Sequence, residues 1–200
     1  MTNFLLAGVG GQGIILASDI LAEVGAAAGC DAKKSEIHGM SQRGGSVDSH
    51  VRWGRKVYSP VAPRGEVDYI LAFEIMEGAR HIDFLSPGGV VIVNTQKIPP
   101  LPVASGAARY PDTEDLMAVY RARAGRVVEL DALALARVLG QPAVVSTIML
   151  GALAAFLNLD EPVWLDVIKR RLPPRLLDVN IVAFQAGKRS VGGYLQTDLA

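Results

Sequence analysis

The sequence predicts a single α/β domain across its 200 residues: Rossmann-like, with a mostly parallel sheet, an inserted hairpin and a helical C-terminal third. Short apolar runs alternate with stretches whose apolar residues recur at helical spacing, and this alternation favours a parallel sheet covered by helices. A glycine-rich turn at residues 8–13 joins the first apolar run to the first helical stretch. A chain of this length can bury one sizeable core, which favours one domain over two.

The strands are predicted from apolar or alternating runs that are bounded by turn residues. Residues 3–9 form the first buried strand, and residues 32–37 form a less hydrophobic second one. Gly54 and its neighbours predict a hairpin turn between residues 47–53 and residues 56–59. The remaining predicted strands are residues 67–73, 90–93 and 127–130.

The helices are predicted from apolar residues at helical spacing and from the residues that end them. Residues 14–28 form the first helix, which Gly29 closes, because glycine commonly follows the last turn of a helix. Residues 98–103 contain three prolines, which predicts an extended connection with no helix. The remaining predicted helices are residues 75–85, 113–124, 132–139, 145–157, 162–172 and 180–188.

Composition and charge exclude several classes of function. Lys plus Arg number 20 and Asp plus Glu number 20, so the net charge is zero and the basic footprint of a nucleic-acid binder is absent. No polybasic run indicates a membrane surface, and no apolar run reaches the roughly 18 residues that span a bilayer. Residues 1–8 lack the basic start of a signal peptide. We therefore expect a cytoplasmic protein whose partners include no nucleic acid and no membrane.

The metal-binding capacity of the chain is limited by its single cysteine, Cys30. One thiol cannot form an intrachain disulfide, and an iron–sulfur cluster usually takes four thiolates. The three histidines are too scattered for zinc spacing. We therefore expect this chain alone to bind no metal and no cofactor, and we expect Cys30 to be a small buried hydrophobe.

The first informative motif is the glycine turn between the first predicted strand and the first predicted helix. Gly8 allows a tight turn, Gly10 lets a phosphate approach the backbone, and Gly13 lets the helix pack closely on the strand. The free amides at the start of the following helix offer an anion site. The candidate binding residues in this motif are Gly8, Gly10, Gly11, Gln12 and Gly13.

Three interpretations of this turn stay open. The glycines can simply shape the turn, they can admit a phosphate-bearing ligand, or they can belong to a site for a hydride cofactor. A hydride cofactor needs an acidic residue about 20 positions further on to bind its ribose. Asp31 lies at the start of the second predicted strand, and Glu36 lies against another glycine-rich loop. Lys33 and Lys34 would suit a phosphate instead.

The second motif is the glycine-rich segment that spans residues 38–45, which predicts a loop. Arg43 stands in it among small and neutral residues, and its guanidinium offers a planar five-donor fork to a carboxylate or a phosphate. Ser41 and Gln42 add neutral hydrogen-bonding groups. An ordinary surface loop is the alternative. The candidate binding residues in this segment are Met40, Ser41, Gln42, Arg43, Gly44 and Gly45.

Together with several shorter sequence segments, these two motifs resemble the gamma-type domain of 2-oxoacid:ferredoxin oxidoreductases across residues 1–200. The strings that carry the resemblance are residues 8–13, 36–45, 49–52, 59–60, 94–95, 149–153 and 180–187. The string Gly39-Met40-Ser41-Gln42-Arg43-Gly44-Gly45 is most similar to the beta subunit of the indolepyruvate type. Ser146-Thr147 departs from the pattern, because related subunits often have an asparagine there.

The resemblance implies a role inside a larger enzyme. Enzymes of this family oxidatively decarboxylate 2-oxoacids to acyl-coenzyme A, with thiamine diphosphate, iron–sulfur clusters and coenzyme A, and pass electrons to ferredoxin. It implies that this chain completes the active-site wall of a large subunit that carries the thiamine and the clusters, that it reaches ferredoxin only through the complex, and that it is inactive alone. It implies no catalytic residue in this chain, only contacts from the two glycine-rich motifs.

Two alternatives from other classes remain: a stand-alone Rossmann-type nucleotide-dependent dehydrogenase and a nucleotide-sensing module. The dehydrogenase would need a clear ribose acid and a substrate domain, and the remaining chain is too short for a substrate domain. Among the other ionisable residues, His50 and Arg52 are predicted on the solvated face of a strand, and His81 is predicted at the surface.

Overall fold

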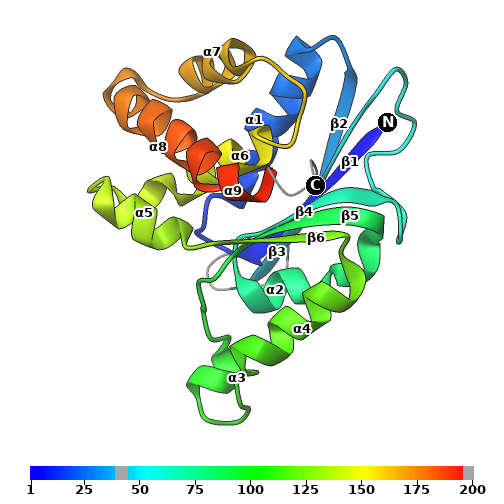
Figure 1. The fold of residues 1–200 in the computed structure, drawn as a ribbon, viewed down its shortest axis with the longest axis vertical. Helices are drawn as coiled ribbons and strands as arrows, with labels where there is room; N and C mark the ends of the chain where they lie inside the picture. The colour runs from blue at the N-terminus through cyan, green and yellow to red at the C-terminus, as the bar shows by residue number, and fades with distance from the viewer. Residues whose placement is uncertain (39–44, 196–200) are drawn as a thin grey trace.

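The computed structural model describes residues 1–38 and 45–195, which form one sheet with helices on both faces (Figure 1). The sheet has six strands in the order β2-β3-β1-β4-β5-β6. The strands are β1 Thr2–Val9, β2 Asp31–His38, β3 Ser46–Gly54, β4 Val67–Ala72, β5 Leu85–Asn94 and β6 Arg126–Leu130.

The strand directions confirm a mostly parallel sheet with one inserted hairpin. Strands β1, β4, β5 and β6 pair in parallel, whereas β3 runs antiparallel to both of its neighbours. The hairpin consists of β2 and β3, so the prediction of a hairpin at Gly54 is wrong, and residues 56–59 form no strand. Both edges of β3 are already paired, with β1 and β2, and no edge remains for a third strand. Val57 instead donates its amide to the Asp31 carboxylate at 2.8 Å.

The helices divide between the two faces of the sheet (Figure 1). The helices α1, α6, α7 and α8 cover one face, and α2 and α4 cover the other. Their bounds are α1 Ile14–Ala27, α2 Ile75–Arg80, α3 Leu101–Ala104, α4 Thr113–Arg123, α5 Ala132–Val138, α6 Val145–Ala154, α7 Glu161–Arg171, α8 Leu177–Ser190 and α9 Gly192–Leu195. Short 3-10 turns occur at Ile82–Phe84, Pro142–Val144 and Pro174–Leu176. The helical C-terminal third is confirmed.

Two further predictions about elements are wrong. The helix predicted for residues 75–85 ends at Arg80, and β5 begins at Leu85 and runs through a Pro-Gly-Gly sequence before the parallel register settles at Val90. The one-turn helix α3 contains a proline that was expected to exclude it. Pro102 occupies the second position of that helix, where an amide has no intrahelical acceptor and proline costs little.

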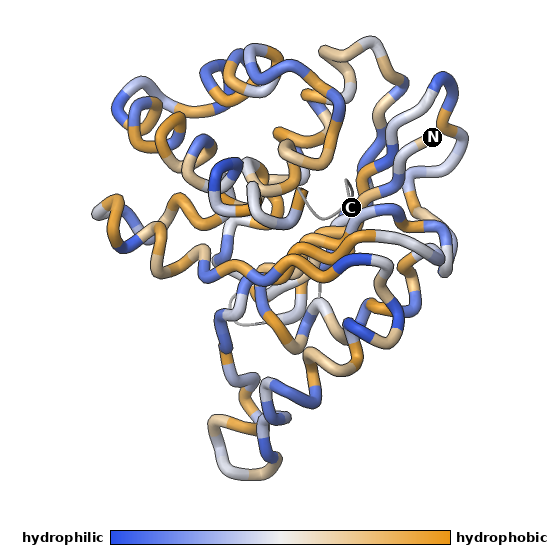
Figure 2. Tube along the Cα trace, in the orientation of Figure 1, coloured by the Kyte–Doolittle hydropathy of each residue, from blue (hydrophilic) through white to orange (hydrophobic). Residues whose placement is uncertain are grey.

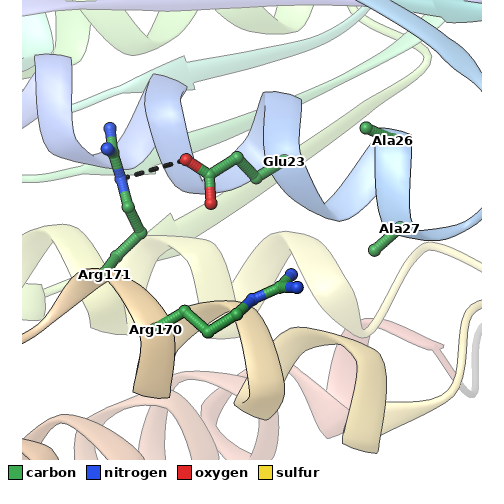
Figure 3. A pocket seen from close by; sticks show the side chains of 5 residues that line it. All are labelled: Glu23, Ala26, Ala27, Arg170 and Arg171. Carbon is green, nitrogen blue, oxygen red and sulfur yellow. Dashed lines mark ion pairs between the residues drawn. The ribbon is translucent and has the colours of Figure 1, made fainter.

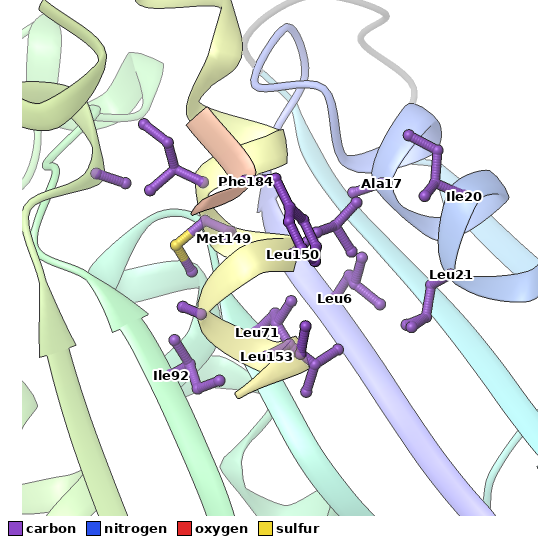
Figure 4. Close-up of a cluster of buried hydrophobic side chains, with 14 of the residues drawn as sticks. Leu6, Ala17, Ile20, Leu21, Leu71, Ile92, Met149, Leu150, Leu153 and Phe184 are labelled. Atoms are coloured by element: carbon purple, nitrogen blue, oxygen red, sulfur yellow. The ribbon is translucent and has the colours of Figure 1, made fainter. Parts of the chain in front are cut away.

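The larger core lies between the sheet and the C-terminal helices. Every residue of α6 is buried, and Figure 4 shows its Met149, Leu150 and Leu153 against side chains of the strands. The strands at the centre of the sheet are correspondingly hydrophobic (Figure 2). The backbones of α6 and α8 are in direct contact where the two helices cross. A Cβ at Gly151 would lie only 2.0 Å from the Phe184 carbonyl oxygen, so only glycine fits there. Within the described ranges, no helix is long and apolar enough to cross a membrane.

Candidate functional site

The candidate site lies at the carboxyl edge of the sheet, where β1 and β4 run side by side in parallel. The helix α1 leaves β1 toward one face, and α2 leaves β4 toward the other (Figure 1). In open α/β sheets, ligands bind in the crevice that forms at such a divergence. The glycine turn of residues 8–13 stands directly at this point.

Two of the glycines are required by packing. Gly8 is the penultimate residue of β1, and an added Cβ would lie 2.8 Å from the Phe73 Cβ. Gly13 has a φ of 80° before the first turn of α1, and an added Cβ would lie 2.9 Å from the Ser146 Oγ. Gly8 and Gly13 therefore bring β1, β4, α1 and α6 together, as the interpretation of the glycines as turn-formers requires.

Gly11 differs from its neighbours because it combines a positive φ with open space. Its φ is 105°, a conformation that side chains rarely adopt, and it is exposed. Among the described residues, no heavy atom lies within 4 Å of the position that a Cβ would take. Gly11 is thus the residue of the turn at which another chain or a ligand could approach the backbone.

Gln12 holds the turn in place from inside. Its Oε1 accepts a hydrogen bond from the Val9 amide at 2.8 Å, and its Nε2 donates to the Phe73 carbonyl at 2.8 Å. The same Nε2 lies 3.1 Å from the Gln96 Oε1. The Gln12 side chain therefore links the ends of β1, β4 and β5, and its role within the chain is to brace the turn.

Asn94 continues this brace along the edge of the sheet. It is fully buried, donates from Nδ2 to the Phe73 carbonyl at 2.9 Å and accepts from the Ala132 amide at 3.1 Å. Through these two bonds Asn94 joins the ends of β4 and β5 to the first turn of α5. The carboxyl edge thus carries one connected set of amide side chains.

Glu74 follows β4 and is a buried carboxylate with a relative exposure of 0%. One oxygen caps α2 by accepting the Glu77 amide at 2.8 Å. The other accepts the Ile98 amide at 3.1 Å and the Tyr110 hydroxyl. Burial, with the nearby carboxylate, raises the pKa of Tyr110 well above its usual range, so the phenol stays a donor. Glu74 therefore joins the carboxyl end of β4 to both ends of the segment 97–111.

The two predicted motifs meet through their backbones. The Gly10 amide donates to the Gly45 carbonyl at 2.9 Å, so this amide is used inside the chain. Met40, Ser41, Gln42, Arg43 and Gly44 lie outside the described residues.

The structure does not fit a dinucleotide in the Rossmann manner. That mode needs an acidic residue at the end of a strand adjacent to β1. Here β3 lies between β1 and β2, which removes Glu36 from the strand next to the turn. Lys34 also forms ion pairs with both Glu36 and Asp19. Iron–sulfur clusters do not fit either, because the chain has one cysteine, the half-buried Cys30.

The prediction that His50 and Arg52 lie on a solvated face is wrong. Arg52 is 8% exposed and donates to the Asn3 side chain at 2.8 Å and to the Val61 carbonyl at 3.1 Å. His50 is 1% exposed, and burial lowers its pKa to about 4. The connection between β3 and β4 covers this face, which strand periodicity alone could not show. His81 is half-buried rather than a surface residue.

A surface groove of about 530 Å³ opens elsewhere, between α1 and α7 (Figure 3). Its lining includes Glu23, Arg170 and Arg171, and the Arg171 Nε lies 3.2 Å from the Glu23 carboxylate. Glu23 lies in the C-terminal half of α1, about 15 Å along the helix from the glycine turn, and the two arginines lie at the end of α7. The groove is therefore separate from the candidate site.

Sequence reasoning missed Glu74, Gln96 and Tyr110. Glu74 and Gln96 each lie two residues after the end of a buried strand, and a polar residue at that place is the signal that could have found them. No sequence signal pointed to Tyr110, because it returns to the sheet edge only after the excursion of residues 97–111.

Comparisons with known proteins agree along almost the whole chain. The family described as pyruvate ferredoxin/flavodoxin oxidoreductase matches residues 3–190. The chain is 37% identical over 191 residues to indolepyruvate oxidoreductase subunit IorB of Thermococcus kodakarensis, covering 94% of this chain and 95% of the relative. It is 38% identical over 187 residues to the subunit of the same name from Methanothermobacter thermautotrophicus, covering 92% and 95%.

Solved structures share the fold. The gamma subunit of a keto/oxoacid ferredoxin oxidoreductase from Geobacter sulfurreducens has a TM-score of 0.69 at 23% identity, covering 95% of this chain and 98% of that one. The 2-oxoglutarate:ferredoxin oxidoreductase of Magnetococcus marinus has a TM-score of 0.74 at 21% identity, and the match covers 96% of this chain but only 31% of that longer chain. By its sequence match over nearly its full length, the chain belongs to the pyruvate ferredoxin/flavodoxin oxidoreductase family.

Proposed function

We propose that this chain is the small subunit of an indolepyruvate-type 2-oxoacid:ferredoxin oxidoreductase, which converts aryl 2-oxoacids to acyl-coenzyme A. The observation that carries the proposal is the end-to-end match to relatives that are themselves named as subunits, with 95% of the relative covered. A cytoplasmic location stays a prediction.

The proposal divides the chemistry between two subunits. Thiamine diphosphate supplies carbanion stabilisation, iron–sulfur clusters supply electron transfer to ferredoxin, and coenzyme A accepts the acyl group. One cysteine and a braced glycine turn suit none of the thiamine or cluster sites, so we assign these to the larger subunit. This chain supplies a fixed wall at the carboxyl edge of its sheet.

The two glycine-rich motifs form the part of that wall that meets the larger subunit or coenzyme A. Gly11 offers open backbone, and Arg43 is proposed as the charged contact to a carboxylate or a phosphate. Gly10 and Gln12 support the turn through bonds to Gly45 and Phe73. The dehydrogenase and sensor alternatives are disfavoured, because β3 separates Glu36 from the turn.

The experiment is co-production of this chain with a large thiamine- and cluster-bearing subunit, followed by purification of either subunit alone and of the pair. We expect only the pair to reduce a viologen dye with coenzyme A and 2-oxoacids, with aryl pyruvates preferred over alkyl ones. Turnover by this chain alone with thiamine diphosphate would contradict the subunit assignment. A preference for alkyl 2-oxoacids would contradict the indolepyruvate assignment and leave the subunit role intact.

A further inference from the structure

A protruding segment at the candidate edge has a composition that solvent exposure alone does not explain. Residues 97–111 leave the end of β5, project away from the body and return to α4, with α3 near the tip (Figure 1). Residues 98–108 contain no charged side chain. Leu101 in α3 is 80% exposed, and Pro102 and Ala104 are exposed beside it. Because the tip projects from the body and is apolar and uncharged, it is suited to contact with a partner.

The segment is organised before any partner arrives. The Val103 and Ala104 amides both donate to the Pro100 carbonyl at 2.9 Å, and the Ala108 amide donates to the Pro102 carbonyl at 3.0 Å. The prolines restrict the backbone further. A tip that is already ordered loses little conformational entropy on binding, which is the property of a rigid docking element.

The base of the segment is fixed to the sheet by Glu74. The same buried carboxylate oxygen accepts the Ile98 amide at one end of the segment and the Tyr110 hydroxyl at the other. The Lys97 ammonium lies 5.8 Å from the centre of the Tyr110 ring and closes the base from outside. The projection is therefore a braced hairpin-like arm with a defined direction.

The arm is continuous with the candidate site. Gln96, which directly precedes it, lies 3.1 Å from the Nε2 of Gln12 in the glycine turn and 3.3 Å from the Nδ2 of Asn94. A partner that reaches the turn at the carboxyl edge therefore also meets the base of the arm. In the Magnetococcus marinus enzyme this fold accounts for 31% of the matched chain, so a large additional body is tethered to it there.

We propose that residues 97–111 form a docking arm whose apolar tip, centred on Leu101, inserts into an apolar recess of the larger subunit, and that Glu74 is the residue that positions it. The proposal rests on the proposed function for the identity of the partner. The matching recess carries no unpaired charge, because the arm offers none between residues 98 and 108. At the base of the arm, Lys97 lies over the Tyr110 ring and Arg109 pairs with Asp112 at 3.4 Å, so the charges that flank the apolar tip are engaged within the chain.

The test compares two exposed apolar side chains at opposite edges of the sheet. Leu101→Asp places a charge at the tip of the arm, and Tyr58→Asp places one in the connection that follows the end of β3, where Tyr58 is 87% exposed. Each full-length variant is titrated with the purified large subunit, and its melting temperature and its own oligomeric state are measured in parallel. We expect Leu101→Asp to weaken binding at least about tenfold, Tyr58→Asp to bind like the parent, and both to melt within about 2 °C of it.

Each other outcome overturns the proposal in a distinguishable way. Parent-like binding by Leu101→Asp shows that the arm is not a docking element while the subunit assignment stands. If the parent self-associates through the arm, and Leu101→Asp abolishes only that self-association, the occupant is a second copy of this chain. If the parent itself does not bind the large subunit, the proposed function fails and the docking partner fails with it.

Discussion

At the residue scale, the glycine turn separates positions that build the fold from a position that is open to a partner. Gly8 and Gly13 are in contact with Phe73 and Ser146, and a side chain at either would force a shift of these neighbours. Gly11 has the positive φ without the crowding. One sequence motif therefore contains both structural and exposed glycines, which the spacing of the letters cannot distinguish.

A matched pair of glycine substitutions tests this separation. Gly11→Ala and Gly65→Ala both place a side chain at positive φ, 105° and 78°, in space that is open among the described residues. We expect both to lower the free energy of unfolding by about 1 kcal/mol for the same backbone reason. Only Gly11→Ala should reduce turnover of the assembled enzyme. Equal turnover in the two variants, measured with saturating partner, would show that Gly11 is not a contact.

Buried His50 gives the chain a defined pH dependence. Its pKa in the folded state is about 4, against 6.5 for the free side chain, because burial, and after it the neighbouring His81 and Arg52, disfavour the protonated imidazole. The Asp48 carboxylate lies 3.7 Å from the Nε2, too far for a hydrogen bond that would compensate. The unfolded chain therefore takes up a proton below pH 6.5 that the folded chain excludes.

The free energy of unfolding is therefore unaffected by His50 above pH 6.5, and it declines as the pH falls from 6.5 toward 4. The full shift corresponds to at most about 3 kcal/mol in the free energy of unfolding. Urea unfolding between pH 4.5 and 7.5 should show the decline, and His50→Gln should flatten it. His81→Gln leaves the buried imidazole in place and should retain the decline. A parent curve that is flat over this range would mean that His50 accepts the proton in the folded state.

At the scale of elements, sequence patterns predicted the strands and helices that depend on local periodicity. The first strand and first helix were predicted within one residue at each end, at Thr2–Val9 and Ile14–Ala27. The hairpin at Gly54 was wrong because strand pairing depends on which edges are free, and that is a property of the whole sheet. The polar strand Asp31–His38 was predicted, but its place beyond β3 could not be.

The candidate site was likewise predicted only where it depends on local sequence patterns. The turn and its position before α1 were predicted from spacing, since glycine has specific backbone uses. Glu74 and Tyr110 were not, because their importance comes from a contact that joins residues far apart in the sequence. The burial of His50 was likewise invisible, since the connection that covers it has no pattern of its own.

The brace at the base of the docking arm predicts a local effect of Tyr110→Phe. The variant removes the hydroxyl that Glu74 accepts and leaves the Glu74 cap of α2 and the Ile98 bond in place. We expect a loss of about 1.5–3 kcal/mol, as for a hydrogen bond to a charged group. Hydrogen exchange should accelerate in residues 98–110 first. Tyr69→Phe, which removes a 3.4 Å contact to the Phe156 carbonyl, is the control and should leave that segment unchanged.

Unchanged exchange of residues 98–110 in Tyr110→Phe would mean that the prolines and the internal bonds hold the arm without Glu74. The docking surface itself would then still be tested by the substitution at Leu101, because that side chain lies away from the brace.

At the scale of the whole molecule, one edge of the sheet carries the glycine turn, the amide brace and the base of the arm. The groove beside Arg171 lies at the other end of α1 from the glycine turn. The features that we propose to meet a partner therefore lie together at the carboxyl edge of the sheet. This arrangement suits a subunit that completes a site rather than one that holds a cofactor of its own.

We expect the larger subunit to depend on this chain for turnover, and a titration measures that dependence. Viologen reduction with an aryl pyruvate and coenzyme A is measured while this chain is added to a fixed amount of the large subunit. Activity should rise from near zero and saturate at a fixed molar ratio of the two subunits. Full activity of the large subunit before any addition, or activity of this chain with no large subunit present, would contradict this expectation.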